Sequence, residues 1–150
     1  MSEDACLPRC PRRLLKVVSA LDVNSERYRS GAGLTWCNRW VSDVTAEILG
    51  VDAVPFRLAN EQLAWLGGLD AAAHGWELVT PLEAFIAAAA GEVVVVGWRN
   101  PDGHGHVAIG VPGAAPGAEL HIAQAGLRNF ASKPISSGFG SHAVEIYRHR

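Results

Sequence analysis

The chain has 150 residues, of which 49% are hydrophobic and 19% charged, and its formal net charge is -2. This length suits one domain, and the composition is typical of a globular protein rather than a disordered one. A net charge this close to zero excludes a strongly basic surface that would bind nucleic acid or anionic membranes. No apolar run is long enough for a transmembrane helix.

The N-terminus is expected to form an arm of residues 1–11, ahead of a single domain of residues 12–150. It begins with acidic residues and lacks the apolar stretch of a secretory signal, so we expect a chain made in the cytoplasm without such a signal. Cys6 and Cys10 lie between prolines in this arm. They fit a short disulfide, half of a metal site or two separate thiols, and the sequence leaves these alternatives open.

Apolar residues at helical spacing predict two helices in the first part of the chain. In residues 12–21 and 37–49 they recur three or four positions apart, which places them on one face of each helix. Residues 24–33 are polar and contain glycine, so a loop leads toward the second helix. That helix begins at Cys37 and is ended by Gly50.

Capping residues predict two further helices. Asn60 is suited to cap a helix that stops at the glycine pair 67–68. Thr80 is a stronger signal, because Pro81 follows at the first helical position and Glu83 completes a capping box. We expect this last helix to end near Gly91.

The character of the sequence changes after residue 91. Valine-rich or alternating segments at residues 92–98, 106–111, 119–124 and 144–148 predict strands, and turn-forming residues separate the first two. Residues 125–142 are rich in glycine and serine and predict a long loop. Helices followed by strands joined through turns indicate an α+β fold with an antiparallel sheet of about four to six strands.

Cys37 is the candidate nucleophile. A catalytic thiol needs a lowered pKa, because the thiolate is the attacking form, and a helix N-terminus lowers it through unpaired N–H groups and partial positive charge. The Cys37 N–H is also placed to stabilise an oxyanion. The alternative is that Cys37 is a small core residue on the apolar face of its helix.

His106 is the candidate base. It begins the predicted strand 106–111, in which His106, Ala108 and Gly110 share one face. Small residues on this face leave room for a helix, and if helix 37–49 packs there, the imidazole reaches the thiol. His104 lies in the preceding turn and is not expected to be the base. A histidine at a strand end, exposed to solvent, is the alternative.

A third polar group is needed to orient the imidazole. Gln124 ends a stripe formed with Leu120 and Ile122 on the next strand, and its amide oxygen accepts a ring N–H without adding a charge. A strand end that simply meets solvent is the alternative interpretation of Gln124. The rival candidates for the orienting role are Asn129, Asn38 and His121.

These segments resemble the CHAP and NlpC-type cell-wall cysteine peptidases. The resemblance rests on residues 35–44 around Cys37, on Gly103-His104-Gly105-His106-Val107-Ala108-Ile109, and on residues 121–126 around Gln124, with Asn129-Phe130 following. The NlpC-type pattern has Asp-Cys-Ser-Gly at the nucleophile, whereas Trp36 and Asn38 flank Cys37 here. This difference favours the CHAP type or the compact amidases that secretion systems deliver.

The resemblance implies a papain-like fold, with N-terminal helices carrying the cysteine packed on an antiparallel sheet carrying the histidine. It implies hydrolysis of amide bonds in peptidoglycan stem peptides or cross-links, with no cofactor. The implied catalytic residues are Cys37, His106 and Gln124. The candidate substrate contacts are Trp36, Asn38, Tyr28 and Asn129, and Trp36 fits the core equally well.

The same resemblance bears on partners and location. It implies a peptidoglycan peptide as substrate, action on the cell wall after specialised secretion or lysis-mediated release, and a cognate inhibitor or immunity protein as a further partner. We expect a monomer with no nucleic-acid or membrane partner.

Alternatives from other classes are weaker. The metal-binding alternative rests on His104 and His106, with Cys37 and His121 as further ligands. The sequence has no second pair of closely spaced ligands and no His-Glu-x-x-His helix. A non-catalytic peptidoglycan-binding module of the same fold would not need all three residue types. A glycosidase is disfavoured because the candidate carboxylates fit helix faces and caps: Asp43, Glu47, Glu61 and Glu83.

Overall fold

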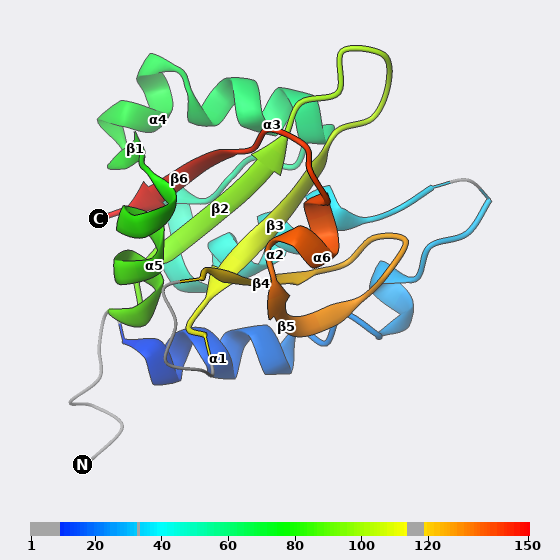
Figure 1. The fold of residues 1–150 in the computed structure, drawn as a ribbon, viewed down its shortest axis with the longest axis horizontal. Coiled ribbons are helices and arrows are strands. Elements are labelled where there is room, and N and C mark those ends of the chain that lie inside the picture. The colour runs from blue at the N-terminus through cyan, green and yellow to red at the C-terminus, as the bar shows by residue number, and fades with distance from the viewer. Residues whose placement is uncertain (1–9, 33, 114–118) are drawn as a thin grey trace.

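The computed structural model describes residues 10–32, 34–113 and 119–150, and has an α+β fold with N-terminal helices packed on a six-stranded antiparallel sheet (Figure 1). The helices are α1 (Pro11–Ala20), α2 (Cys37–Leu49), α3 (Ala59–Leu66), α4 (Leu69–Ala73), α5 (Pro81–Ala89) and α6 (Ser136–Phe139). The strands are β1 (Trp76–Leu78), β2 (Val93–Trp98), β3 (His106–Val111), β4 (His121–Gln124), β5 (Phe130–Pro134) and β6 (Glu145–His149). The predicted fold class is confirmed.

The sheet is built around a hairpin of two valine-rich strands. Its strand order is β1-β6-β2-β3-β4-β5, so β2 pairs with β6 on one side and with β3 on the other. In the hairpin, Trp98 at the end of β2 lies opposite His106 at the start of β3. β4 continues the sheet with Gly110 opposite Ile122. This register brings the start of β3 and the end of β4 to the same end of the sheet.

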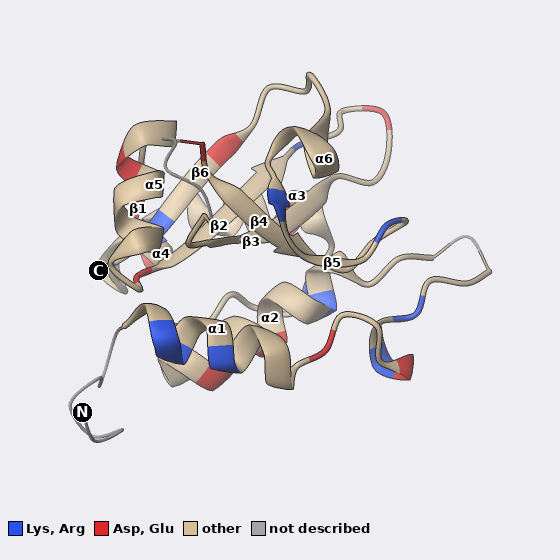
Figure 2. Cartoon of the chain, turned by 60° about the horizontal axis from the view of Figure 1, so that its bottom comes forward, with Lys and Arg blue, Asp and Glu red and all other residues tan. Residues whose placement is uncertain are grey.

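The two faces of the sheet carry separate cores. Helices α1, α2 and α3 cover one face with large side chains, among them Leu14, Trp40 and Leu63. Helix α5 covers the other face with Ala84, Ala87 and Ala88, and Phe139 of α6 belongs to the same core. Figure 1 shows α5 and α6 in front of the sheet with α2 behind it, and Figure 2 shows α1 and α2 beneath it.

One expectation about packing is wrong. Helix α2 packs on the β3 face of Val107, Ile109 and Val111, not on the face of Ala108 and Gly110. The space beside Ala108 and Gly110 is filled by other residues. A Cβ at Gly110 would contact Val94 and Leu120, and Ala108 shares a core with the α5 alanines. The small residues therefore make room for α5.

The predicted boundaries are close where signals are strong. Helix α5 starts as expected, with the Thr80 hydroxyl accepting the Glu83 N–H and the Glu83 carboxylate accepting the Thr80 N–H. Helix α3 begins one residue before Asn60 and is capped differently, because Glu61 accepts the Leu58 N–H. The Asn60 side chain instead binds the β2–β3 turn.

Several short elements were not predicted. Strand β5 and helix α6 lie inside the segment 125–142 expected to be a loop, and β1 and α4 lie between the predicted helices. Each is three to five residues long. Helix α1 begins at Pro11, inside the expected arm, with Cys10 as its cap; Cys6 lies outside the described residues. Segments this short carry too few residues for a recognisable period.

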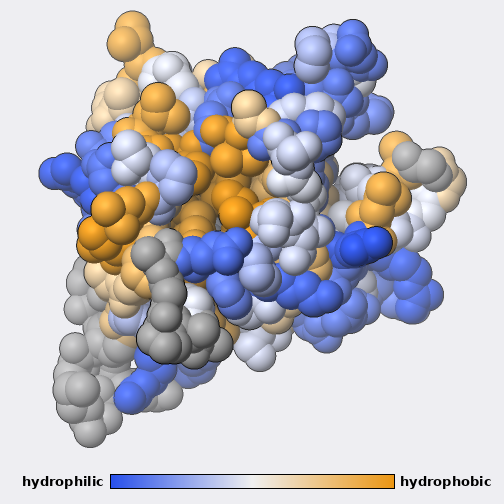
Figure 3. Space-filling view, in the orientation of Figure 1, coloured by the Kyte–Doolittle hydropathy of each residue, from blue (hydrophilic) through white to orange (hydrophobic). Residues whose placement is uncertain are grey.

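The surface is mixed in character. Figure 2 shows charged residues spread over the helices and loops, and Figure 3 shows apolar side chains gathered over α5 and the adjoining sheet. Leu82 and Ile86 of α5 contribute to this exposed apolar surface. Across the described ranges, no helix has the length and apolarity needed to span a membrane.

Candidate active site

Cys37 occupies the first position of α2 and is a free thiol with only 3% of its surface exposed. Its sulfur lies among backbone N–H groups of Val107, Asn38 and Cys37 itself, and near the Thr35 side chain. Val107 follows His106 on β3, so the thiol lies against the strand at the position next to the candidate base. The helix N-terminus and the start of β3 are thus brought together.

The His106 ring projects from the other face of β3. It is held in a half-buried position by the Phe139 ring, whose centroid is 4.9 Å away, and by Gly126, where a Cβ would lie 3.2 Å from His106 Cε1. The ring edge with Nδ1 and Cε1 therefore runs past a residue without a side chain. Larger side chains at residue 126 would press on the imidazole.

Gln124 binds the imidazole, as the strand pattern predicted. His106 Nε2 lies 2.7 Å from Gln124 Oε1, and Gln124 Nε2 donates to the Arg128 carbonyl at 2.9 Å. Because the amide nitrogen is already committed as a donor, Oε1 accepts the imidazole proton from Nε2. In the neutral ring Nδ1 is then unprotonated, which makes it the nitrogen able to take a proton from a thiol.

The turn before His106 is fixed from helix α3. Asn60 Nδ2 donates to the carbonyls of Asn100 and Gly103, and Asn60 Oδ1 accepts the Asn100 N–H at 3.0 Å. A Cβ at Gly105 would collide with Asn60 and with the Trp98 carbonyl. The β2–β3 turn therefore approaches α3 closely, which sets where β3 and His106 begin.

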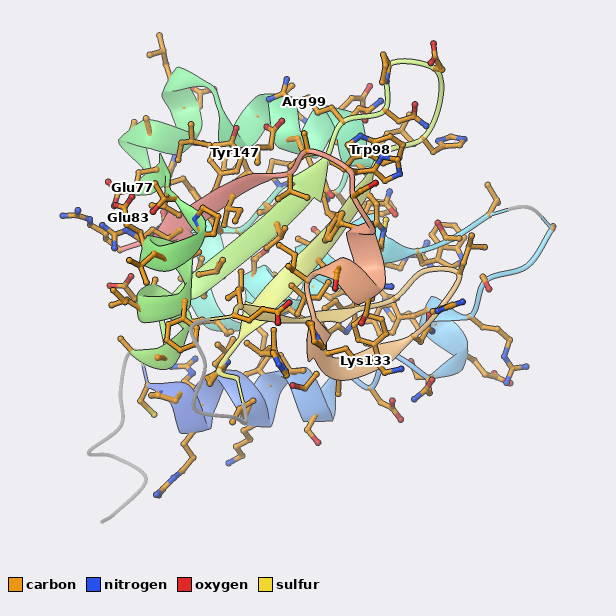
Figure 4. The ribbon with its side chains drawn as sticks, viewed as in Figure 1. Glu77, Glu83, Trp98, Arg99, Lys133 and Tyr147 are labelled. Carbon is orange, nitrogen blue, oxygen red and sulfur yellow. The ribbon has the colours of Figure 1, made fainter. Side chains whose placement is uncertain are left out.

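Cys37, His106 and Gln124 line one pocket of about 550 Å³. Its walls come from the loop before α2, the start of α3, the β2–β3 turn, the loop after β4, and α6 with the loop that follows. Trp98 stacks on His142 with ring centroids 3.7 Å apart and an interplanar angle of 14°. Figure 4 places Trp98 at the end of β2, with Glu77 and Glu83 at the opposite end of the sheet.

The pKa of the Cys37 thiol differs from the value expected from the sequence. Burial raises the pKa of the Cys37 thiol above its ordinary value, although the backbone N–H groups of Val107 and Asn38 act to lower it. The predicted net lowering of the Cys37 pKa is therefore wrong, because burial of the sulfur in the core outweighs the effect of the helix N-terminus. Burial also lowers the pKa of His106, while the Gln124 hydrogen bond acts to raise it. Both shifts favour a neutral thiol beside a neutral imidazole.

Within the described residues, no hydrogen bond joins the Cys37 thiol to His106 in this conformation. The side chains approach the pocket from opposite faces of the sheet, around the start of β3. The described side chains are therefore arranged as a neutral thiol and a neutral imidazole in one pocket, not as a thiolate–imidazolium pair.

The predicted substrate contacts divide into two groups. Trp36 and Asn38 line the pocket, although the Asn38 amide is also bound to the Arg57 carbonyl. Tyr28 is buried and its hydroxyl donates to Asp43 at 2.5 Å, so it belongs to the core. Asn129 accepts the Gly126 N–H and donates to the Val23 carbonyl, and it shapes the loop without lining the pocket. We do not retain Tyr28 and Asn129 as substrate contacts.

The rivals to Gln124 have other partners. The Asn129 and Asn38 side chains bind backbone groups, and His121 Nδ1 lies 3.0 Å from the Ser132 hydroxyl. As for the metal-binding alternative, the parts of the chain that the structure describes contain no group of three or more His, Cys, Asp or Glu arranged to hold a metal ion.

The sequence did not identify several pocket residues. The Trp98–His142 stack joins β2 to the segment after α6, and Phe139, Gly126 and Gly138 surround the imidazole and its amide partner. All of them except Trp98 lie in the segment 125–142 that was expected to be a loop. The glycines there were a weak signal of close approach, because such residues are also ordinary loop formers.

No family model matches the chain, and no curated protein is detectably similar to it. The chemistry of the site must therefore be inferred from its own residues.

Proposed function

We propose that the protein is a cysteine hydrolase of amide bonds, with Cys37 as nucleophile, His106 as base and Gln124 as the residue that orients the base. One observation carries the proposal: a thiol at a helix N-terminus and an imidazole held through Nε2 by an amide line the same pocket. A nucleophile, a base and an orienting group are the three parts that acyl-transfer enzymes of this kind require.

The chemistry follows from the tautomer of His106. Nδ1 takes the proton from the Cys37 sulfur as the sulfur attacks the substrate carbonyl, and the resulting oxyanion is stabilised by the Cys37 N–H at the start of α2. His106 then gives this proton to the leaving amine, which departs as the carbon–nitrogen bond breaks. Water, deprotonated by Nδ1, hydrolyses the thioester and returns the free thiol.

The proposed substrate class is the peptide part of peptidoglycan. The support is the resemblance of the three segments around Cys37, His106 and Gln124 to cell-wall cysteine peptidases, together with the order of helices and strands that carries them. Delivery by a specialised secretion route or by lysis, and a cognate inhibitor protein, belong to the same proposal.

The decisive test is digestion of purified peptidoglycan by the wild-type protein and by Cys37→Ala. We expect new free amines on stem peptides or cross-links, identified by mass spectrometry, and none with the variant, whose melting temperature should remain close to that of the wild type. New reducing sugar ends would instead indicate a glycosidase. Full activity of Cys37→Ala would exclude the thiol as nucleophile.

One observation favours a second candidate, a peptidoglycan-binding module without activity. The thiol is buried and makes no hydrogen bond to His106 within the described residues. Such a module would bind stem peptides equally well as the wild type and as Cys37→Ala, and neither would release amines. The same digestion therefore separates the two candidates.

A further inference from the structure

The charge of the pocket lining is one-sided. None of the described residues that line it is an aspartate or a glutamate, whereas Arg128 contributes a cation and His104 and His142 contribute imidazoles. Two carboxylates on neighbouring elements are already engaged. Asp43 binds Arg27 and Tyr28, and Glu61 accepts the Leu58 N–H.

Arg128 is attached to the candidate catalytic residues through its own backbone. Its carbonyl accepts the amide of Gln124, the side chain that holds His106. The surrounding loop is fixed at two more points: the Gly126 N–H donates to Asn129 Oδ1 at 2.8 Å, and Asn129 Nδ2 donates to the Val23 carbonyl at 2.6 Å. The base of the Arg128 side chain is therefore held at a constant position relative to the imidazole.

The Arg128 guanidinium has no carboxylate partner among the described residues. Arg128 is exposed and, across the described ranges, forms no ion pair, unlike Arg27 and Arg99, which bind carboxylates. Guanidinium is a planar donor that stays charged and pairs with a carboxylate through two parallel hydrogen bonds. A permanent cation in a pocket without acidic residues favours an anionic ligand and disfavours a free amine.

The apolar part of the lining has a separate role. The stacked rings of Trp98 and His142 form a flat wall, and Trp36 is held by the Arg39 guanidinium 4.1 Å from its ring centroid. These surfaces suit aliphatic portions of a peptide but carry no charge complementary to an amine. The ligand that fits both features is a peptide with a carboxylate near an uncharged chain.

We propose that this pocket selects peptides bearing a free carboxylate beside the scissile amide, and that Arg128 binds this carboxylate. The inference rests on the proposed function and adds its substrate preference. Amidation of the carboxylate removes the charge and one acceptor oxygen while leaving the shape of the peptide nearly unchanged. The selection is therefore for charge rather than for size.

The test compares two synthetic stem-peptide fragments, one with its carboxyl groups free and one with them converted to primary amides. Binding to Cys37→Ala is measured by isothermal titration calorimetry, and cleavage by the wild-type protein by mass spectrometry. We expect the free acid to bind more tightly by about 10- to 100-fold, the range for a hydrogen bond to a charged group. The ratio of kcat/KM values should favour the same peptide.

Variants assign the preference to one side chain. Arg128→Gln, introduced into both the wild-type and the Cys37→Ala background, should bring the ratio between the peptides close to one. The backbone carbonyl that Gln124 uses is kept, so the fold should be unaffected. Arg12→Gln, which removes an exposed arginine of α1 outside the pocket, should leave the ratio unchanged.

The outcomes separate this inference from the proposed function. Equal cleavage of both peptides would overturn the inference while the hydrolase remained. Equal binding, or binding of neither peptide, would also overturn it. A binding preference for the free acid that depends on Arg128 would support it, and the absence of cleavage in that case would count against the hydrolase alone.

Discussion

The two faces of the sheet hold their reactive groups in different ways. On the face covered by α2, Cys37 is one member of a core of large side chains that includes Trp40 and Val44, and its position follows from packing. On the face covered by α5 and α6, His106 is positioned by one hydrogen bond to Gln124 and one ring contact with Phe139. The candidate nucleophile is thus fixed by burial and the candidate base by a hydrogen bond and a ring contact, and both lie at the start of β3.

Because of this difference, substitutions on one face should mainly affect stability and substitutions on the other should mainly affect activity. Large side chains on the α2 face, unlike the small side chain of Cys37, contribute much buried apolar area, so their removal should weaken the fold together with the site. The polar groups on the α5 face, His106 and Gln124, contribute little to the buried apolar area. Their removal should therefore reduce turnover more than it reduces the free energy of unfolding.

His106→Ala should give the largest effect on turnover, a loss of about 10²- to 10⁴-fold in kcat, the range typical of general acid–base catalysis. Thermal unfolding followed by circular dichroism should show a nearly unchanged melting temperature. His104→Ala is the matched control, since His104 lines the same pocket but precedes the strand. It should retain most of the activity. Comparable losses in both variants would contradict the assignment of a single base.

Trp40→Ala should destabilise the α2 face strongly. Trp40 has none of its surface exposed, and its indole donates to the Leu21 carbonyl at 2.7 Å. Its removal should lower the free energy of unfolding by about 3–5 kcal/mol, measured by urea titration. Trp98→Ala on the opposite face should cost less, because Trp98 is only half-buried. Equal losses in the two variants would show that the two faces contribute equally to stability.

Gly138→Ala should reduce activity without touching a reactive group. A Cβ at this position would collide with Gln124 Oε1, the atom that binds His106. We expect a loss of about 10- to 100-fold in kcat/KM, similar to that of Gln124→Ala, as for a hydrogen bond that orients a base. Gly103→Ala is the control, since a Cβ there would lie no closer than 3.5 Å to Asn100. Full activity of Gly138→Ala would show that the amide has room to move.

The pH profile should reveal the smallest change. Burial lowers the pKa of His106 below its ordinary 6.5, so its base form is already present at neutral pH and kcat/KM should fall only on the acid side. In Gln124→Glu a carboxylate favours the charged imidazole and raises its pKa, which should move the acid limb upward by on the order of one pH unit. If the acid limb of the Gln124→Glu profile does not move, a group other than His106 titrates there.

The same shift has a consequence for stability. An unfolded chain binds a proton at His106 more readily than the folded one, so the contribution of His106 is fully present above pH 6.5 and is lost as the pH falls below it. Denaturant titrations at several pH values should show this decline in the wild type. His106→Ala should lack this component of the decline.

Much of the site was predictable because it depends on local patterns. The period of two grouped His106 with Ala108 and Gly110 on β3, and Gln124 with Leu120 and Ile122 on β4. The two side chains were predicted to meet if these faces coincide, and their contact is present. The capping signals of Thr80, Pro81 and Glu83 located α5 in the same way. The resemblance to cell-wall peptidases added a substrate class, which stays a prediction.

The packing partner of β3 was not predictable from the strand alone. Ala108 and Gly110 showed that something approaches closely, but both α2 and α5 have an apolar face that could do so. The pKa of Cys37 was missed for a related reason. A helix N-terminus was visible in the sequence, whereas the burial that outweighs it depends on packing against residues about 70 positions away, such as Val107 and Ile109 in the same core.

The hydrogen bond between Asn129 and the Val23 carbonyl spans 106 residues, and it has a consequence for folding kinetics. The loop that bears Arg128 cannot settle until the segment before α2 has docked beneath it. Strand β6 is made after the other five strands, yet it lies between β1 and β2. Contacts so distant in sequence form late, because closing a long loop costs entropy before any contact repays it. A nascent chain that has already made Cys37 and His106 therefore still lacks an assembled pocket, and the pocket should become complete only with the final cooperative folding step.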